Sequence, residues 1–186
     1  MRPDPPGVWW GEPALLWANS GSICVYGHGN ISEKAVSPVV SIINEVLKEF
    51  ELPVCAKVGN IEREDMLRID DIVNAGLDAN HGELDFDAIL RRLTEMRKEE
   101  FLVDGIVILE DHLRFKFTDP VARYGLGCPT GLVILLRFDI KNAVRHEIGH
   151  IVGLGGHHSG CVMDYTCLVS DFCEDCRTRV RNMWKS

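Results

Sequence analysis

Residues 146–153 read His146-Glu147-Ile148-Gly149-His150-Ile151-Val152-Gly153. Residues four apart on an α-helix point the same way, so a helix here would present His146 and His150 to one metal ion. Glu147 would then lie beside the open coordination position, as in the helices of zinc peptidases. The run from Ala143 to Leu154 is otherwise mostly apolar, which is typical of a half-buried helix. The alternative, two ordinary core or surface histidines, gives these polar residues no role, and we favour the metal site.

A glycine-rich segment with two more histidines follows the predicted helix. It reads Leu154-Gly155-Gly156-His157-His158-Ser159-Gly160. The helix is expected to bend at Gly153, because glycine readily adopts the left-handed conformation that ends helices. The next glycines let the chain turn back, so a third histidine is expected to reach the metal.

Four cysteines then lie within sixteen residues: Cys161, Cys167, Cys173 and Cys176. Thiolates are soft ligands, and the two-residue gap that closes this set suits a tetrahedral structural zinc site. Such a site would tie the short C-terminal segment to the end of the active-site loop. The alternative is a redox pair or disulfide between Cys173 and Cys176. A thioredoxin-like motif requires a strand before the cysteines, and none is predicted there.

These elements resemble the signature of the archaemetzincins, a family of metzincin-clan zinc metallopeptidases. That signature usually reads His-Glu-x-x-His-x-x-Gly-x-x-His-Cys, four residues, Cys-x-Met, a longer spacer and Cys-x-x-Cys. Cys161-Val162-Met163 and the last cysteine pair match it, whereas three residues precede His157 and His158 stands where the family has a cysteine. The resemblance is most specific over residues 105–176. It implies a metzincin-like α/β fold with a twisted mixed sheet, backing helices, an active-site helix and a small zinc-stapled C-terminal subdomain.

The resemblance implies a catalytic zinc ion held by three histidines: His146, His150 and His157. His158 is the weaker alternative for the third ligand. Glu147 would act as the general base in the hydrolysis of a peptide bond. Met163 would form an apolar floor beneath the metal without ligating it. Tyr165 matches a Met-x-Tyr pattern of some other metzincins, but a tyrosine here is more often a packed aromatic residue.

A second, structural zinc ion would be held by the cysteines, which makes two zinc ions per chain. Because the family's first cysteine is missing, Cys167 or His158 has to replace it, and we favour Cys167 together with Cys161, Cys173 and Cys176. The predicted function is a zinc metallopeptidase that hydrolyses peptide bonds, with short peptides or N-termini as the expected substrates. The alternative is a non-catalytic zinc-binding protein that keeps the cysteine site and has an empty or vestigial histidine site.

The composition favours one domain and argues against nucleic acid as a partner. A chain of 186 residues with 46% hydrophobic content can bury one core but is short for two independent domains. We expect residues 1–153 to form an N-terminal subdomain that ends in the active-site helix, and residues 154–186 to form the C-terminal subdomain. The net charge of −8 is unfavourable for binding nucleic acid.

The sequence also predicts a soluble, cytoplasmic protein. Residues 1–19 contain prolines and tryptophans instead of a basic start and an apolar core, so no signal peptide is expected. No apolar run reaches the roughly 18 residues that cross a bilayer, so no membrane partner is expected. Cys24, Cys55 and Cys128 lie apart in apolar surroundings, as do buried thiols of a reducing compartment. The oligomeric state is not predicted.

The pattern of apolar residues is that of an α/β sheet. We predict four strands, at Ser22–Tyr26, Pro53–Val58, Gly105–Leu109 and Leu132–Phe138. The last two are continuous apolar runs, as expected for strands covered on both faces by helices. Ser37 and Pro38 are expected to begin a helix that ends near Phe50, and Asp85 is expected to cap a second one.

The segment Leu113–Phe117 has a different pattern, because apolar and basic residues alternate as they do on an edge strand. The resemblance implies that an antiparallel edge strand forms the upper rim of the cleft, where an extended peptide can add itself. Arg114 and Lys116 would then meet acidic side chains of the substrate. The alternative is a charged edge that only resists aggregation.

Overall fold

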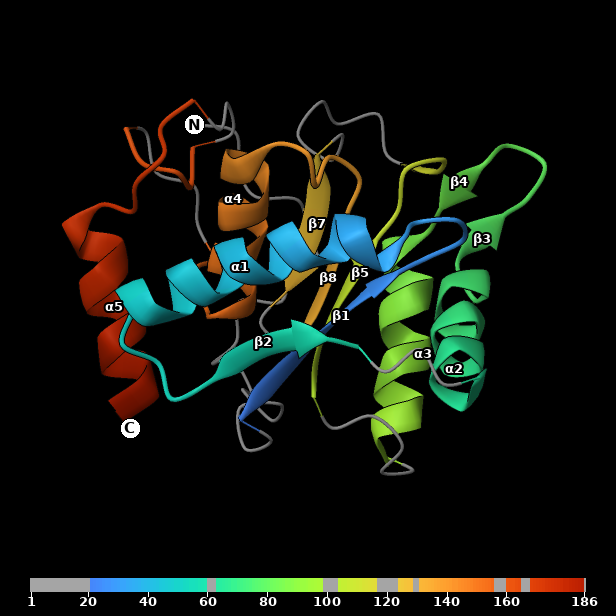
Figure 1. Cartoon of the computed structure of the whole chain (residues 1–186), viewed down its shortest axis with the longest axis horizontal. Helices are drawn as coiled ribbons and strands as arrows, with labels where there is room; N and C mark the ends of the chain where they lie inside the picture. The colour runs from blue at the N-terminus through green and yellow to red at the C-terminus, as the bar shows by residue number, and fades with distance from the viewer. Residues whose placement is uncertain are drawn as a thin grey trace.

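The computed structural model describes residues 21–59, 63–98, 104–116, 124–128, 131–155, 160–164 and 168–185. Its central sheet has five strands in the order β2 (Cys55–Val58), β1 (Ser22–Gly27), β5 (Gly105–Leu109), β8 (Leu132–Leu135) and β7 (Gly125–Cys128) (Figure 1). The first four strands are parallel, and β7 runs antiparallel to β8 at the edge. The predicted α/β class and mixed sheet are confirmed.

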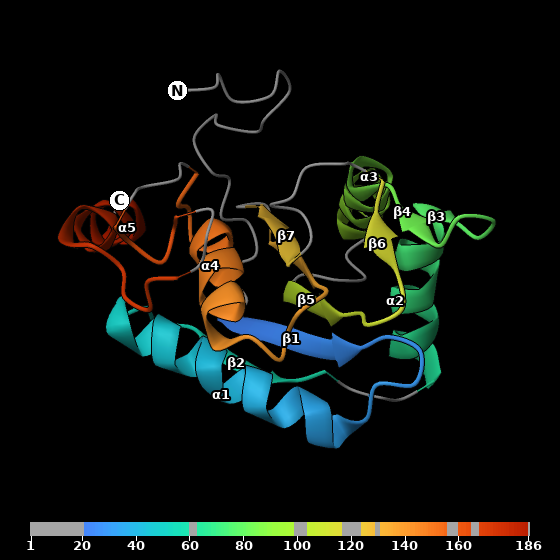
Figure 2. The ribbon, with the colours of Figure 1, turned by 90° about the horizontal axis from the view of Figure 1, so that it is seen from above.

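Helices cover both faces of this sheet. They are α1 (Glu33–Glu49), α2 (Arg63–Asn74), α3 (Phe86–Lys98) and α4 (Lys141–Ile151). Ile23 and Val25 of β1 pack into a core with α1 and α4, whereas Cys24 and Tyr26 point to the opposite face and pack with α2 and α3. Figure 2 shows α2 and α3 at one end of the molecule and α5 (Glu174–Lys185) at the other. Burial on both faces explains the continuous apolar runs.

Helix α1 begins earlier than the sequence predicts. Its N-cap is Ser32, and Pro38 lies inside the helix. Pro38 has no N–H to donate, but the helix continues through it because Val36, on the N-terminal side, is buried in the core. The hydroxyl of Ser37 donates to the carbonyl of Glu33 at 3.2 Å instead of capping the helix. The predicted start at Ser37 and Pro38 is therefore wrong.

The predicted edge strand near residue 114 belongs to a second, three-stranded sheet. That sheet has the order β3 (Leu77–Asp78), β4 (Glu83–Leu84) and β6 (Arg114–Phe115), and β6 pairs with β4 in parallel. β6 is therefore an edge strand, but not the antiparallel edge of the main sheet. The cause is Phe115, which is buried and meets Phe86 of α3 edge-on, with ring centroids 6.1 Å apart. Phe117 lies outside the described residues.

The antiparallel edge of the main sheet is β7, and it lies against the active-site helix α4 predicted from residues 146–153. The C-terminal segment also packs on this side, because Val162, Met163, Phe172 and Val180 belong to the core formed with α1 and α4. Cys24 and Cys128 are buried as predicted, whereas Cys55 is exposed. None of the helices within the described ranges combines the length and apolar character that crossing a membrane requires.

Candidate metal centres

Helix α4 is buried along almost its whole length, from Ala143 to Ile151, and it lies unusually close to β7. Two glycines of β7 make this approach possible. A Cβ atom on Gly125 would lie 2.9 Å from Cγ of Glu147, and one on Gly127 would lie 3.2 Å from Cβ of His150. Glycine in a strand often marks such a close approach. β7 therefore lies directly against the turn of α4 that carries the motif.

The two histidines of α4 aim the same ring nitrogen at one point. Nε2 of His146 and Nε2 of His150 are 3.2 Å apart. Each Nδ1 donates to a backbone carbonyl, that of Val162 at 2.9 Å and that of Leu154 at 2.7 Å. A carbonyl only accepts, so each neutral ring carries its proton on Nδ1 and turns the lone pair of Nε2 toward the other ring.

This arrangement fits a metal ion. Two nitrogen lone pairs that face each other repel, and a cation between them removes the repulsion. Ligands about 2.0–2.1 Å from a tetrahedral zinc ion lie about 3.3 Å apart, close to the observed separation of the His146 and His150 nitrogens. Burial lowers the pKa of His146, which favours the neutral, metal-ligating form of its ring. Carbonyl partners on Nδ1 are also typical of metal-binding histidines.

Glu147 is the most unusual carboxylate among the described residues. The residue is only 3% exposed, and its Oε2 has no hydrogen-bond partner in the part of the chain that the structure describes. Burial raises its pKa to about 8. An orphaned, buried carboxylate is costly in a structural position, and such groups concentrate in catalytic sites. The predicted base is therefore buried, and it directly follows His146 on α4.

Met163 lies against the same turn of α4. It is fully buried, and its sulfur occupies the space that a side chain at position 149 would need, so Gly149 is required there. The preceding residue, Val162, supplies the carbonyl that orients His146. The segment Val162–Met163 thus packs against Gly149 of α4 and also accepts a hydrogen bond from the ring of His146.

Three further predicted site residues and one candidate aromatic lie outside the described residues: His157, His158, Cys167 and Tyr165. The third histidine ligand and the fourth ligand of the cysteine site therefore stay predictions.

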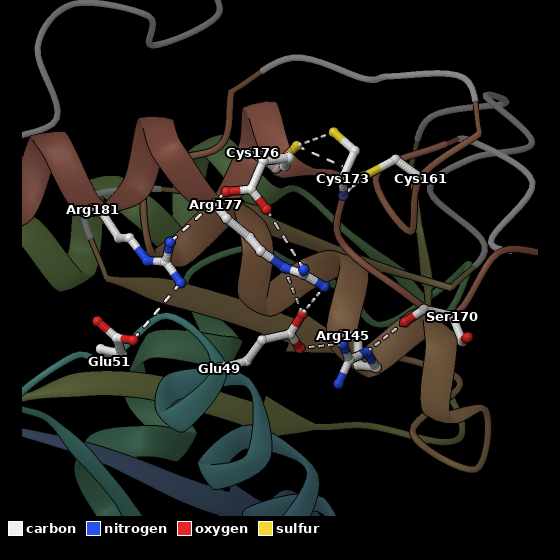
Figure 3. Close-up of polar contacts among 10 residues, drawn as sticks. Glu49, Glu51, Arg145, Cys161, Ser170, Cys173, Cys176, Arg177 and Arg181 are labelled. Carbon is white, nitrogen blue, oxygen red and sulfur yellow. Dashed lines mark hydrogen bonds and ion pairs between the residues drawn. The ribbon is translucent and has the colours of Figure 1, made fainter.

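The structure brings three of the four cysteines together. The sulfurs of Cys161, Cys173 and Cys176 all lie within 4.8 Å of one another. Sγ of Cys176 is 3.7 Å from that of Cys161 and 3.4 Å from that of Cys173 (Figure 3). Sulfurs about 2.3 Å from a tetrahedral zinc ion lie about 3.8 Å apart, so this set can hold a metal ion. A disulfide needs about 2.05 Å, and Cys173 and Cys176 are free thiols.

The thiols differ in acidity. Burial and the neighbouring thiols raise the pKa of Cys176. Burial acts in the same direction on Cys173, but hydrogen bonds, first that of the Cys176 N–H, outweigh it and lower the pKa of Cys173. The backbone N–H of Cys173 donates to the sulfur of Cys161 at 3.2 Å.

The glycines of β7 were not identified from the sequence. A signal for them exists, because Gly125-Leu126-Gly127 places two glycines on the same face of a strand shortly before the motif helix. Their role depends on the packing of α4, which the strand pattern alone does not give.

Comparisons with known proteins agree with the predicted fold. The crystal structure of an archaemetzincin from Methanopyrus kandleri is similar with a TM-score of 0.61 and 20% identity over 89% of this chain and 96% of that one. A zinc-dependent peptidase from Methanocorpusculum labreanum is similar with a TM-score of 0.54 and 20% identity over 85% of this chain and 99% of that one. No protein-family model and no curated protein matches the chain. The archaemetzincin resemblance is therefore confirmed at the level of the fold.

Proposed function

We propose that this chain is a zinc-dependent peptidase of the metzincin type. The observation that carries the proposal is the pair of Nε2 atoms 3.2 Å apart on the helix that also carries Glu147, whose buried Oε2 has no hydrogen-bond partner among the described residues. His146 and His150 would hold the catalytic zinc ion, with His157 as the predicted third ligand. Zinc bound there would supply Lewis-acid activation of the peptide carbonyl and of the attacking water.

Glu147 is the proposed general base. It would take a proton from the attacking water and pass it to the leaving amine. The buried surroundings of Glu147 strengthen every electrostatic interaction in the site, including the attraction between its carboxylate and a bound metal ion. The carbonyl partners of His146 and His150 would keep both rings aimed while this transfer takes place.

The edge strand β7 is the proposed site for the substrate backbone. Within the described residues it pairs only with β8, so its other edge is open for an extended peptide. Gly125 and Gly127 bring its backbone against Glu147 and His150. A peptide paired with β7 would therefore lie beside the histidine pair. Short peptides and N-termini are the proposed substrates, and the cysteines are proposed to hold a second, structural zinc ion.

The first test is zinc content per chain by plasma mass spectrometry, for the wild type and His146→Ala. We expect two zinc ions in the wild type and one in the variant. One zinc ion in both proteins would favour a non-catalytic zinc-binding protein that uses only the thiols.

The second test uses Glu147→Gln and a library of short peptides analysed by mass spectrometry. The variant should keep both zinc ions and lose at least about 10²-fold in cleavage rate, because only the proton acceptor is removed. Wild-type turnover in this variant would refute the role of Glu147.

A further inference from the structure

A partly buried charge network connects the elements that carry the two candidate metal centres. At its middle is Glu49, the last residue of α1, whose carboxylate accepts hydrogen bonds from two arginines (Figure 3). One oxygen accepts from Arg145 of α4 at 2.5 Å. The other accepts from Arg177 of α5 at 2.8 Å and 3.2 Å. The arginines are sequence neighbours of His146 and Cys176, one from each centre.

Arg145 contacts a carboxylate, a backbone carbonyl and an aromatic ring. Its side chain is only 8% exposed, and it also donates to the carbonyl of Ser170 at 2.7 Å. Its guanidinium lies over the ring of Phe172, 5.2 Å from the centroid. Among the described residues, Glu49 is the carboxylate within ion-pair distance of Arg145. Arg177 has a second, longer pair with the exposed Glu174 at 3.8 Å. Loss of Glu49 would therefore leave Arg145 as an uncompensated buried charge, which is strongly unfavourable.

The contact between Arg145 and Ser170 is connected to both candidate metal centres by backbone hydrogen bonds. Asp171, the next residue, accepts a hydrogen bond from the N–H of Val162 at 2.8 Å. The carbonyl of Val162 orients the ring of His146, and Val162 directly follows Cys161. The position of residues 170–172 therefore affects the partner of a proposed histidine ligand and the neighbour of a proposed thiolate ligand.

A second ion pair between the same two helices does not have these connections. Glu45, one turn earlier on α1, pairs with Lys141 of α4 at 2.6 Å. Both side chains are more than half exposed. Exposed pairs of this kind contribute little, because water screens them. This pair is the internal control for Glu49.

We propose that Glu49 is a positioning residue that couples the two metal centres. The inference rests on the proposed function, since it assumes a metal ion at the histidines. Among the described residues, Glu49 contacts no proposed ligand side chain. It acts by fixing Arg145 and Arg177, which hold residues 170–172 and the start of α5. Groups hydrogen-bonded directly to metal ligands typically change metal affinity by about 10–100-fold when mutated, and the lower end of this range is expected for Glu49, which acts through Arg145 and the backbone.

The experiment measures Co²⁺ affinity at the histidines of protein that carries one zinc ion at the thiols. Calorimetric titration is done on the wild type, Glu49→Gln and Glu45→Gln, and His146→Ala identifies which binding event belongs to the histidines. The intense absorption of thiolate-bound Co²⁺ reports the other centre in fully Co²⁺-loaded samples. We expect Glu49→Gln to weaken the histidine site by about tenfold or more and to weaken the thiol site as well. Glu45→Gln should match the wild type within about twofold.

Two further variants separate positioning from loss of folding. Glu49→Asp keeps the charge and should recover part of the lost affinity. Arg177→Gln removes the hydrogen bonds between α5 and Glu49 but keeps those between Glu49 and Arg145, so it should weaken the thiol site more than the histidine site. These variants keep the proposal testable if Glu49→Gln does not fold.

Unchanged affinity at both sites in Glu49→Gln, with only a lower melting temperature, would overturn the proposal. Equal losses in Glu49→Gln and Glu45→Gln would overturn it too. A wild-type protein that binds Co²⁺ only at the thiols would overturn both this inference and the proposed peptidase function. Wild-type binding at the histidines without an effect of Glu49 would overturn this inference alone.

Discussion

The two candidate metal centres are built in different ways. His146 and His150 lie on one helix, one turn apart, so the helix itself sets the spacing of their side chains. The thiols come from two segments, with Cys161 on one and Cys173 and Cys176 on the other. Their distances of 3.4 Å and 3.7 Å depend on how these segments pack. The histidine pair is a local feature of the chain, and the thiol cluster is a tertiary one.

Because of this difference, we expect the two centres to contribute differently to the stability of the fold. A metal ion at the thiols would hold the C-terminal segment on the core, because Val162, Phe172 and Val180 are buried there. A metal ion at the histidines would add less to the fold, because α4 is already packed in the core through its apolar residues. The geometry of that site would depend instead on the close contacts of α4 with β7 and with Val162.

The largest effect is expected from Cys176→Ser. Loss of a sulfur should release the proposed structural zinc ion and lower the free energy of unfolding by more than about 4 kcal/mol, because metal binding and packing of this segment are linked. Thermal unfolding and zinc content measure the two results. His146→Ala is the matched variant and should keep the thiol metal with a much smaller loss of stability. Equal melting temperatures for the two variants would show that the thiols do not hold the segment.

A smaller effect on stability, but a large one on activity, is expected from Gly125→Ala. The added methyl group would lie 2.8 Å from the carbonyl oxygen of Ile134 on β8 and 2.9 Å from Cγ of Glu147, so β7 or the Glu147 side chain has to move. We expect a cost of about 1–3 kcal/mol in stability and a loss of about 10²-fold in kcat/KM for peptide cleavage.

Leu126→Ala is the control for this glycine. Leu126 lies between the two glycines on the strand and packs on the opposite face, in the core with α2 and α3. It should lower stability without a comparable loss of activity. If both variants lost activity equally, the contact between Gly125 and Glu147 would not be the cause.

Much of the main sheet could be predicted from the sequence, because its signals are local. The strand Gly105–Leu109 has the predicted bounds. Asp85 caps α3 as predicted, and its carboxylate accepts from the N–H of Ala88 at 3.0 Å, whereas α2 was not predicted. The start of α1 could not be predicted, because burial of Val36 outweighs the local signal of Pro38.

In the candidate site, helical spacing predicted that His146 and His150 lie together, and their Nε2 atoms are 3.2 Å apart. The roles of these residues and of Glu147 stay predictions. The charge network around Glu49 was not predictable, because Arg145 and Arg177 lie 96 and 128 residues from it along the chain. The edge strand was assigned to the wrong sheet for a similar reason: alternation reveals an edge but not the strand that it pairs with.

The smallest effect is expected at a charge pair that contacts neither centre. Nδ1 of His28, after β1, lies 2.5 Å from the carboxylate of Glu110, after β5. The hydrogen bond with Glu110 raises the pKa of His28. Burial opposes ionisation of Glu110, but hydrogen bonds from His28 and the N–H of His112 outweigh it and lower the pKa of Glu110. The pair is charged between these two pKa values.

The pH dependence of this pair distinguishes it from the metal centres. A raised pKa of His28 stabilises the fold fully below the usual value of about 6.5, and this contribution is lost as pH rises through the raised value. The lowered pKa of Glu110 stabilises the fold above about 4.5 and is lost only as pH falls below that. The difference in unfolding free energy between wild type and His28→Gln should therefore be about 1–2 kcal/mol near pH 6 and shrink toward pH 9. Urea unfolding across this range, with zinc content constant, measures it. A difference that grows with pH would mean that His28 is not held in its charged form, and that pH acts on the fold through the metal ligands instead.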